Sequence, residues 1–445
     1  MMHSKTTPHS SARTHYLSEY QRVEKNLIDS VEKHLLVRRQ TAIKQFSELG
    51  FPTIKHPDWK HTSLIPFLQT PFSITSPAIN NELAKNIEVS TNPYRLVFIN
   101  GLFSQSLSQV TNLANNVIVN HLANIIQNNP DHLFKHWKTT AAQKKNSFIN
   151  LNTAFMQDGA YIYLPAASQL ESPIELLFIT TEENSFIPIR NIIFAEKNSH
   201  AVIIEKYIAL KTTATSCFTN VVTECFLAEQ SRIQHYKLLE ERETSTHIGN
   251  ILVEQQAKSE FSAYSIALQG ALLRSDVTVK LCQPDAECHL KGLYYAQNKQ
   301  HIAQQTLIEH ASPQTVSSEF YKGIIDGDAR AVFDGKLIVR EKAIKSHAQQ
   351  LNKNLLLSAA AEVVTKPQLE IFVDDIQCTH GASIGQLDEA ALFYLRARGL
   401  TASEARTLLI KAFIRDIIQQ MPLLNTYPFL SHSLKNLVAI DYETV

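Results

Sequence analysis

The amino-acid sequence predicts a mainly β fold in which a strand-rich centre is flanked by helical regions at both ends. From about Tyr161, short runs of β-forming residues alternate with small polar clusters. These clusters recur at intervals of about 27–32 residues and later of about 15–17 residues, and no helix-period segment clearly interrupts them. Such an array indicates a solenoid of stacked rungs, most simply a parallel β-helix, with a pair of β-sandwiches as the alternative.

The N-terminal flank has the pattern of helices followed by an irregular connector. Apolar residues recur at three- and four-residue spacing between positions 14 and 49, which predicts a long amphipathic helix that is broken once. A segment punctuated by prolines follows, and we expect Trp59 and Phe67 to anchor it. Positions 92–101 predict a strand and a turn, and positions 121–155 have a helical pattern.

The C-terminal flank becomes helical after Gly385. The segment 388–399 has a helix pattern that ends at a glycine, a residue suited to the position after a helix. Thr401 and Glu404 form the capping-box pattern that begins a second amphipathic helix. A last helix is expected at 430–440. We expect these helices to lie at the end of the solenoid, where they cap its last rung or present a docking face.

Length and pattern together divide the chain into three regions. A chain of 445 residues is long enough for a sizeable core and for two to four folding units. The predicted regions are an N-terminal helical region with a proline-rich connector and a short strand at 1–155, a β-helix core at 156–385 and a C-terminal helical region at 386–445.

Composition excludes several function classes. Lys+Arg and Asp+Glu both number 42, so the formal charge is zero, which argues against a primary nucleic-acid role. No apolar run approaches the roughly 18 residues of a membrane span, and the first residues are polar and lack an apolar signal core. We therefore expect a cytoplasmic protein with no membrane association. The cysteines are odd in number, scattered and without a Cys-x-x-Cys, which fits reduced thiols.

Cys378 and His380 are the candidate metal ligands. If positions 372–380 are extended, alternation places both side chains on one side of the strand together with Ile376. A thiol and an imidazole in this arrangement suit a soft metal, but such sites usually have about four donors, so the rest must come from elsewhere in the fold or from another chain. On composition alone, a buried thiol and a hydrogen-bonded core histidine is the simpler interpretation.

The same stretch resembles the SufB/SufD family of iron–sulfur cluster assembly proteins. The resemblance lies in VDDIQCTHGA at 373–382 and FYLRARG at 393–399. LGFPTIKHPDWKHT at 49–62 is similar to an N-terminal motif of the SufD branch, and VFING at 97–101 resembles the strand that precedes the SufD core. Gly381 stands where the SufB branch typically has Glu, which favours the SufD branch.

The resemblance implies a fold, a site and partners. The fold would be a right-handed parallel β-helix between helical regions, and the function that of a scaffold subunit of the SufBCD complex. The chain would form a heterodimer with SufB, and His380 would help to bind iron or a nascent iron–sulfur cluster transiently at the interface, with Cys378 in a less defined role. A homodimer in isolation is also compatible with this reading.

The resemblance also implies that the C-terminal helices dock the ATPase SufC. The matched stretch contains the candidate contact residues Phe393, Leu395, Arg398 and Glu404. No Gly-x-x-x-x-Gly-Lys-Ser/Thr sequence is present, so we expect a non-catalytic scaffold whose partner hydrolyses ATP.

Two other functions are compatible with the sequence. One keeps the family but makes the chain a SufB-type homodimeric scaffold, against which Gly381 argues. The other is a β-helix polysaccharide lyase or hydrolase that uses Asp326, Asp328 and Asp334. Nearby glycines favour solvated turns for these acids. Cys282, Cys288 and His289 are interpreted as core and surface positions rather than as ligands.

Overall fold

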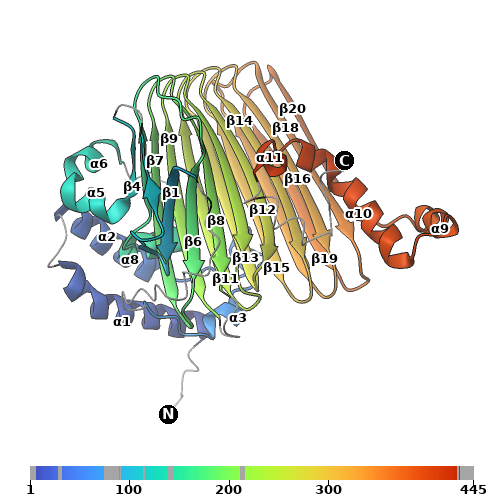
Figure 1. Cartoon of the computed structure of the whole chain (residues 1–445), viewed down its shortest axis with the longest axis horizontal. Coiled ribbons are helices and arrows are strands. Elements are labelled where there is room, and N and C mark those ends of the chain that lie inside the picture. Colours follow the sequence, from blue (N-terminus) through green and yellow to red (C-terminus); the bar gives the residue numbers. More distant parts are fainter. Residues whose placement is uncertain are drawn as a thin grey trace, which may run out of the picture.

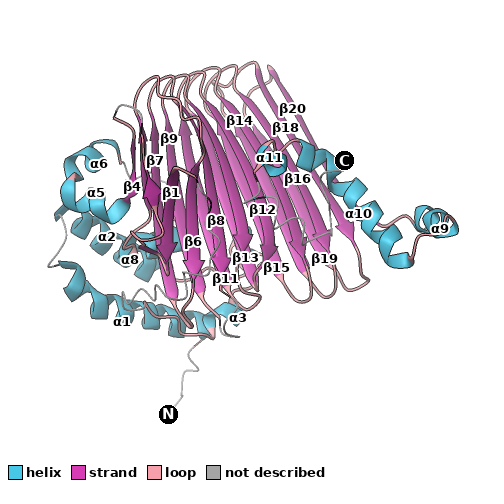
Figure 2. Cartoon of the chain, viewed as in Figure 1, coloured by secondary structure: helices cyan, strands magenta, loops and turns pink. Residues whose placement is uncertain are grey.

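The computed structural model of the chain is a β-solenoid of about eight turns, with helices packed on its outer surfaces (Figure 1, Figure 2). The structure describes residues 7–28, 33–74, 90, 92–113, 116–137, 145–210, 216–427 and 430. The helix expected at 430–440 lies outside these residues, apart from its first position. No helix in the described ranges is both long enough and apolar enough to cross a membrane.

Two sheets form the solenoid; from residue 160 on, successive strands alternate between the two sheets and pair in parallel within each one. The first sheet holds, in spatial order, β2 (Leu102–Phe103), β1 (Tyr94–Ile99), β6 (Ile174–Thr180), β8 (His200–Ala209), β10 (Arg232–Glu240), β12 (Glu260–Gln269), β14 (Glu287–Ala296), β16 (Val316–Ile325), β18 (Ser346–Leu356) and β20 (Ile376–Gln386), with β3 (Gln109–Val110) beside β1. The second holds β19 (Glu362–Ile371), β17 (Arg330–Val339), β15 (His301–His310), β13 (Leu272–Leu281), β11 (Thr246–Gln255), β9 (Phe218–Leu227), β7 (Phe186–Ala195), β5 (Ala160–Leu164) and β4 (Ile118–His121). The predicted mainly β solenoid is confirmed.

The turns explain the period seen in the sequence. Six successive passages from the second sheet to the first, from β7–β8 to β17–β18, each contain one residue with positive φ, a conformation that asparagine and aspartate tolerate better than most residues. These residues are Asn198, Gln230, Lys258, Asp285, Gln314 and Lys345. The N–H of each one donates to a carbonyl in the next turn, as in the 3.1 Å bond from Asn198 to Glu229. The shorter intervals arise because the turns at the opposite edge, such as 326–329, also carry polar clusters.

The core fills the space between the two sheets. Inward side chains from successive strands stack in register, for example Ala201, Ile233 and Phe261 on β8, β10 and β12. Side chains that point inward alternate with side chains that point out of the solenoid, so each sheet has a second face to cover. Helices cover part of both outer faces.

The N-terminal helices cover the second sheet at its early strands (Figure 1). They are α1 (Pro8–Ile28), α2 (Lys33–Leu49), the 3-10 turn η1 (Pro57–Trp59), α3 (Ile65–Leu68), α5 (Leu122–Asn128), α6 (Pro130–His136) and α8 (Ser147–Phe155). Trp59 and Phe67 are buried as predicted and pack with Phe148 against Phe218 of β9. The broken helix over 14–49 is confirmed as α1 and α2. This aromatic cluster fixes the helical region to the solenoid.

The C-terminal helices take a different place from the one expected. They are α9 (Glu389–Ala397), α10 (Ala402–Gln419) and α11 (Leu423–Thr426). The C-terminal half of α10 packs Ile414 and Ile417 on the outer face of the first sheet, against Tyr236 and Tyr264. The expectation that the helices cap the last rung was wrong for this part of α10, because its apolar side packs on aromatic side chains that point outward from the first sheet. The capping box of Thr401 and Glu404 is confirmed.

Candidate functional site

The candidate ligands lie on β20, the last strand of the first sheet. Cys378 is opposite Ala348 of β18 and His380 is opposite Gln350, and both of these β18 residues are buried in the core. Cys378 and His380 therefore point toward the interior of the solenoid at its open end. Cys378 is partly buried and packs against the core, while His380 is exposed. The structure thus places the two predicted residues on one side of one strand.

The start of this strand differs from the expectation. Positions 372–375 form the turn from β19 to β20, and regular pairing begins at Ile376. The turn is needed because the chain must cross here from one sheet to the other. The alternation from Ile376 to His380 nevertheless holds.

Burial affects the thiol. It raises the pKa of Cys378 above its ordinary value, and a backbone hydrogen bond involving Ala348 opposes this shift. A raised pKa keeps the group as a thiol at neutral pH, whereas the thiolate is the form that binds metal. Within the described residues no group of three or more His, Cys, Asp or Glu side chains could hold a metal ion. Among the described residues, the β20 end therefore brings together two candidate donors, Cys378 and His380.

Behind His380 lies a polar column that the sequence did not reveal. Glu319 of β16 pairs with Gln350 of β18 in register, and Gln350 pairs with His380 of β20. Gln350 donates a hydrogen bond from Nε2 to the Glu319 carboxyl group. Both side chains are 1% exposed. Burial raises the pKa of Glu319 to about 7.

The two strands that end the solenoid differ in how well their free edges are protected. β19 is the last strand of the second sheet and carries Lys366 and Pro367, residues that discourage pairing at an edge. β20 is the last strand of the first sheet, and its sequence IQCTHGASIGQ contains no proline and no Asp, Glu, Lys or Arg. Ile384 of β20 is 50% exposed. An edge of this length without protection is suited to pair with another strand.

The C-terminal arm, formed by α9 and α10, is a second exposed feature. α9 buries none of its residues, and in Figure 1 it projects away from both sheets. Phe393 is 75% exposed, Leu395 is partly buried, and the Arg398 guanidinium lies 5.1 Å from the centre of the Tyr394 ring. Exposed apolar residues gathered on one helix are common at interaction surfaces.

Glu404 has a local role in this arm. Its carboxylate accepts hydrogen bonds of 2.7 Å from both the backbone N–H and the hydroxyl of Thr401, and these bonds lower the pKa of Glu404. The carboxylate thus completes the start of α10. This contact accounts for Glu404 without any partner.

Two family models match this chain over regions that include β20 and most of the C-terminal arm. The sequence model described as "SUF system FeS cluster assembly, SufBD core domain" matches residues 178–413, and the one for the "SufBD protein N-terminal region" matches residues 10–176. The chain belongs to the SufB/SufD family. The core match includes β20, α9 and the first two thirds of α10.

Relatives in other organisms match over most of the chain. An iron–sulfur cluster assembly SufBD family protein of Synechocystis is 31% identical, over 90% of this chain and 90% of its own length. The iron–sulfur cluster assembly protein SufD of Escherichia coli is 29% identical, over 86% of this chain and 88% of its own. Protein ABCI7 of Arabidopsis thaliana, a chloroplastic protein, is 31% identical over 62% of this chain and 59% of its own.

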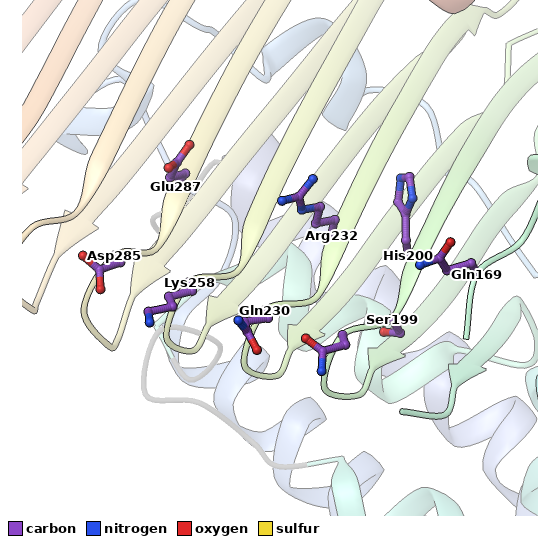
Figure 3. A pocket seen from close by; sticks show the side chains of 9 residues that line it. Gln169, Ser199, His200, Gln230, Arg232, Lys258, Asp285 and Glu287 are labelled. Atoms are coloured by element: carbon purple, nitrogen blue, oxygen red, sulfur yellow. The ribbon is translucent and has the colours of Figure 1, made fainter. Parts of the chain in front are cut away.

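This SufB/SufD family chain also has a polar groove at the edge where the second sheet passes into the first (Figure 3). The groove has a volume of about 570 Å³ and crosses five successive turns. Its lining mixes cations with carboxylates, and Arg232 Nε lies 3.8 Å from Glu260 Oε2 on the next strand. The lining residues are Gln169, Asn198, Ser199, His200, Gln230, Arg232, Lys258, Asp285 and Glu287. Nothing in this mixture selects one class of ligand.

The three acids considered for a glycosidase-like site contact different elements. Asp326 lies in a turn and is 3.4 Å from Arg406 of α10, and Asp328 is exposed in the same turn. Asp334 lies within β17, is 8% exposed and accepts a 2.6 Å hydrogen bond from Gln368 of β19. The expectation of a turn was therefore wrong for Asp334, whose neighbouring glycine is a strand residue. The structure does not assemble these acids into one site.

The other cysteine cluster is also dispersed. Cys288 is fully buried between the sheets, whereas His289 points outward and bonds to Ser318 Oγ at 2.8 Å. Cys282 lies in a turn, with its Sγ 3.6 Å from the Lys280 carbonyl. All five cysteines are free.

Proposed function

We propose that this chain is a SufD-type scaffold subunit that pairs with SufB through the free edge of β20. The observation that carries the proposal is the unprotected β20 edge, which bears both candidate ligands. A partner strand added to this edge would satisfy its free backbone groups and would bring further donors beside Cys378 and His380. Gly381 next to His380 favours a SufD-type over a SufB-type chain.

The cargo of the paired site would be iron or a nascent iron–sulfur cluster. A thiolate and an imidazole are donors that iron and its sulfur clusters accept. Two donors leave a site incomplete, so the cargo would be held only while the partner supplies the others. Transient binding of this kind suits a scaffold that must release its product.

The C-terminal arm would dock the ATPase SufC. Support comes from the exposed aromatic residues Phe393 and Tyr394 on a helix that contacts neither sheet. The chain itself has no phosphate-binding loop in its sequence, so ATP hydrolysis is assigned to the partner. Movement of the arm upon hydrolysis would be transmitted to the first sheet through the buried half of α10.

An edge variant tests the pairing. Ile384→Lys places a cation on β20 that a covering partner would have to bury, so we expect recovery of coexpressed SufB to fall at least about tenfold in a pull-down. Gln256→Lys, an exposed turn position in the middle of the solenoid, is the matched control and should retain SufB.

Two results would contradict the proposal. One is wild-type recovery of SufB by Ile384→Lys, since it would show that the partner does not cover this edge. The other is a homodimer of the chain that persists in the presence of SufB, as measured by light scattering after gel filtration. That second result would favour the SufB-type homodimeric scaffold.

A further inference from the structure

Gln350 is a buried amide whose nitrogen is hydrogen-bonded within the described residues and whose oxygen is not. Its Nε2 donates to Glu319, but within the described part of the chain its Oε1 has no partner. A buried amide oxygen without a donor costs about 1–3 kcal/mol, so such a group in a native core has a reason or a missing partner.

The register places His380, whose imidazole carries an N–H, beside Gln350. The two residues are register partners on adjacent parallel strands, about 4.8 Å apart, and both face the interior. Asn352, the next inward residue of β18, is already satisfied, because its Nδ2 donates to Tyr294 and its Oδ1 accepts from Asn354. Gln350 Oε1 is therefore the free acceptor on β18 closest in register to the imidazole.

The packing around Gln350 leaves space for its side-chain amide. At Gly335 of β17, a side chain would collide with the Gln350 amide group, so the glycine allows Gln350 to lie across the interior. Glu319 then holds the amide in one orientation, with nitrogen toward the carboxyl group and oxygen on the other side. The inward residues beside it on the second sheet, Phe333 of β17 and Thr365 of β19, carry no charge, and the Thr365 hydroxyl has no hydrogen-bond partner among the described residues.

We propose that Gln350 is a positioning residue for His380. Its Oε1 accepts a hydrogen bond from one ring N–H of His380, which fixes the tautomer and directs the other ring nitrogen to the open end of the solenoid. The chain of bonds runs from the imidazole N–H to the Gln350 oxygen and from the Gln350 N–H to the Glu319 carboxyl group. Partners of this kind orient metal-binding histidines and increase their basicity.

The consequence for cluster assembly rests on the proposed function, but the hydrogen bond does not. Nuclear magnetic resonance of the full chain, labelled with ¹⁵N at histidine and held at pH 8, reads the tautomer directly. The His380 signals are assigned by their loss in His380→Gln. We expect well-separated shifts for the two ring nitrogens in the wild type, and convergence of these shifts in Gln350→Met, where both tautomers interchange.

Further variants separate positioning from a general structural effect. Gln350→Glu keeps an acceptor oxygen beside His380, so its two ring-nitrogen shifts should stay separated as in the wild type. Gln350→Asn is polar but too short to reach the imidazole and should behave like Gln350→Met. Gln349→Met, on the exposed side of the same strand, should leave the shifts unchanged. Unchanged His380 shifts in folded Gln350→Met, or in Gln350→Asn if the methionine variant does not fold, would overturn the inference.

A second readout tells this inference apart from the proposed function. In the complex with SufB, loss of the positioning bond should lower iron–sulfide cluster yield about tenfold. If the tautomer shifts as expected while His380→Ala still assembles clusters, Gln350 positions His380 but the proposed role of His380 fails. If the tautomer does not respond while His380→Ala abolishes assembly, the proposed function stands and the role of Gln350 fails.

Discussion

Replacing Glu224 with alanine is expected to lower the free energy of unfolding by about 3–5 kcal/mol, because it leaves a buried guanidinium without a counter-charge. Glu224 of β9 and Arg190 of β7 form an ion pair whose side chains are 1% and 2% exposed. The Glu224 carboxylate also accepts a 2.7 Å hydrogen bond from Trp137 Nε1, and Arg190 donates to Asn152 of α8 at 3.2 Å. The pair thus joins the helical region to the second sheet.

Urea denaturation of the full chain measures this effect. The double variant Glu224→Ala, Arg190→Met should recover much of the lost stability, because it removes the uncompensated charge as well as the pair. The exposed pair of Lys197 and Glu229, whose atoms are 2.9 Å apart, is the control, and Glu229→Ala should change stability little. A similar decrease in the free energy of unfolding for Glu224→Ala and Glu229→Ala would contradict this role of the buried pair.

Acidification from pH 7 to pH 4 is expected to destabilise the chain strongly through three buried histidines. Burial lowers the pKa of His247, of His301 and of His310 to about 4 in each case. His310 is bonded at 2.8 Å to both Thr315 and Ser317, and His301 at 3.0 Å to Thr62. These imidazoles are neutral in the folded chain, whereas the unfolded chain binds their protons near pH 6.5.

The sign and size follow from proton linkage. A depressed pKa contributes stability that is present above about pH 6.5 and is lost as the pH falls toward 4, by about 3 kcal/mol per histidine. Glu319 opposes this trend, since its raised pKa favours the folded state at low pH and that contribution is lost as the pH rises toward 7. Burial also raises the pKa of Asp276, which acts in the same direction as Glu319. The three histidines outweigh these two carboxyl groups, so acidification lowers the stability.

Denaturation midpoints between pH 7.5 and pH 4 check this prediction. His310→Gln keeps hydrogen-bonding atoms but cannot titrate, so its stability should fall less steeply with acid than that of the wild type. Equal pH slopes for the two proteins would show that His310 is not held neutral by the fold.

The turns made the solenoid predictable from the sequence. Each strand ends in a short polar cluster, and positions such as Asn198 and Asp285 mark the positive-φ residues at which one rung passes to the next. The helix patterns were also local, because the capping box of Thr401 and Glu404 satisfies the first turn of α10 without tertiary contacts. Turn and capping residues act locally, which is why the strands and helices could be predicted from the sequence.

The interior of the solenoid could not be predicted in the same way. Glu319 and Gln350 lie at inward positions, but alternation alone looks the same whichever face of a strand is polar. Only the register of β16, β18 and β20 shows that these residues align behind His380. The position of α10 on the sheet was likewise hidden, since it depends on aromatic residues about 150 positions or more earlier in the chain, such as Tyr236 and Tyr264.

Anaerobic iron–sulfide reconstitution of the complex with SufB and SufC tests the central claim most directly. We expect that His380→Ala still forms the complex but loses most of the cluster absorbance of the wild type. His347→Ala, an exposed histidine on the outer side of β18, is the matched control and should keep it. A full cluster yield from an intact His380→Ala complex would contradict the claim that the end of β20 is where the cluster is built.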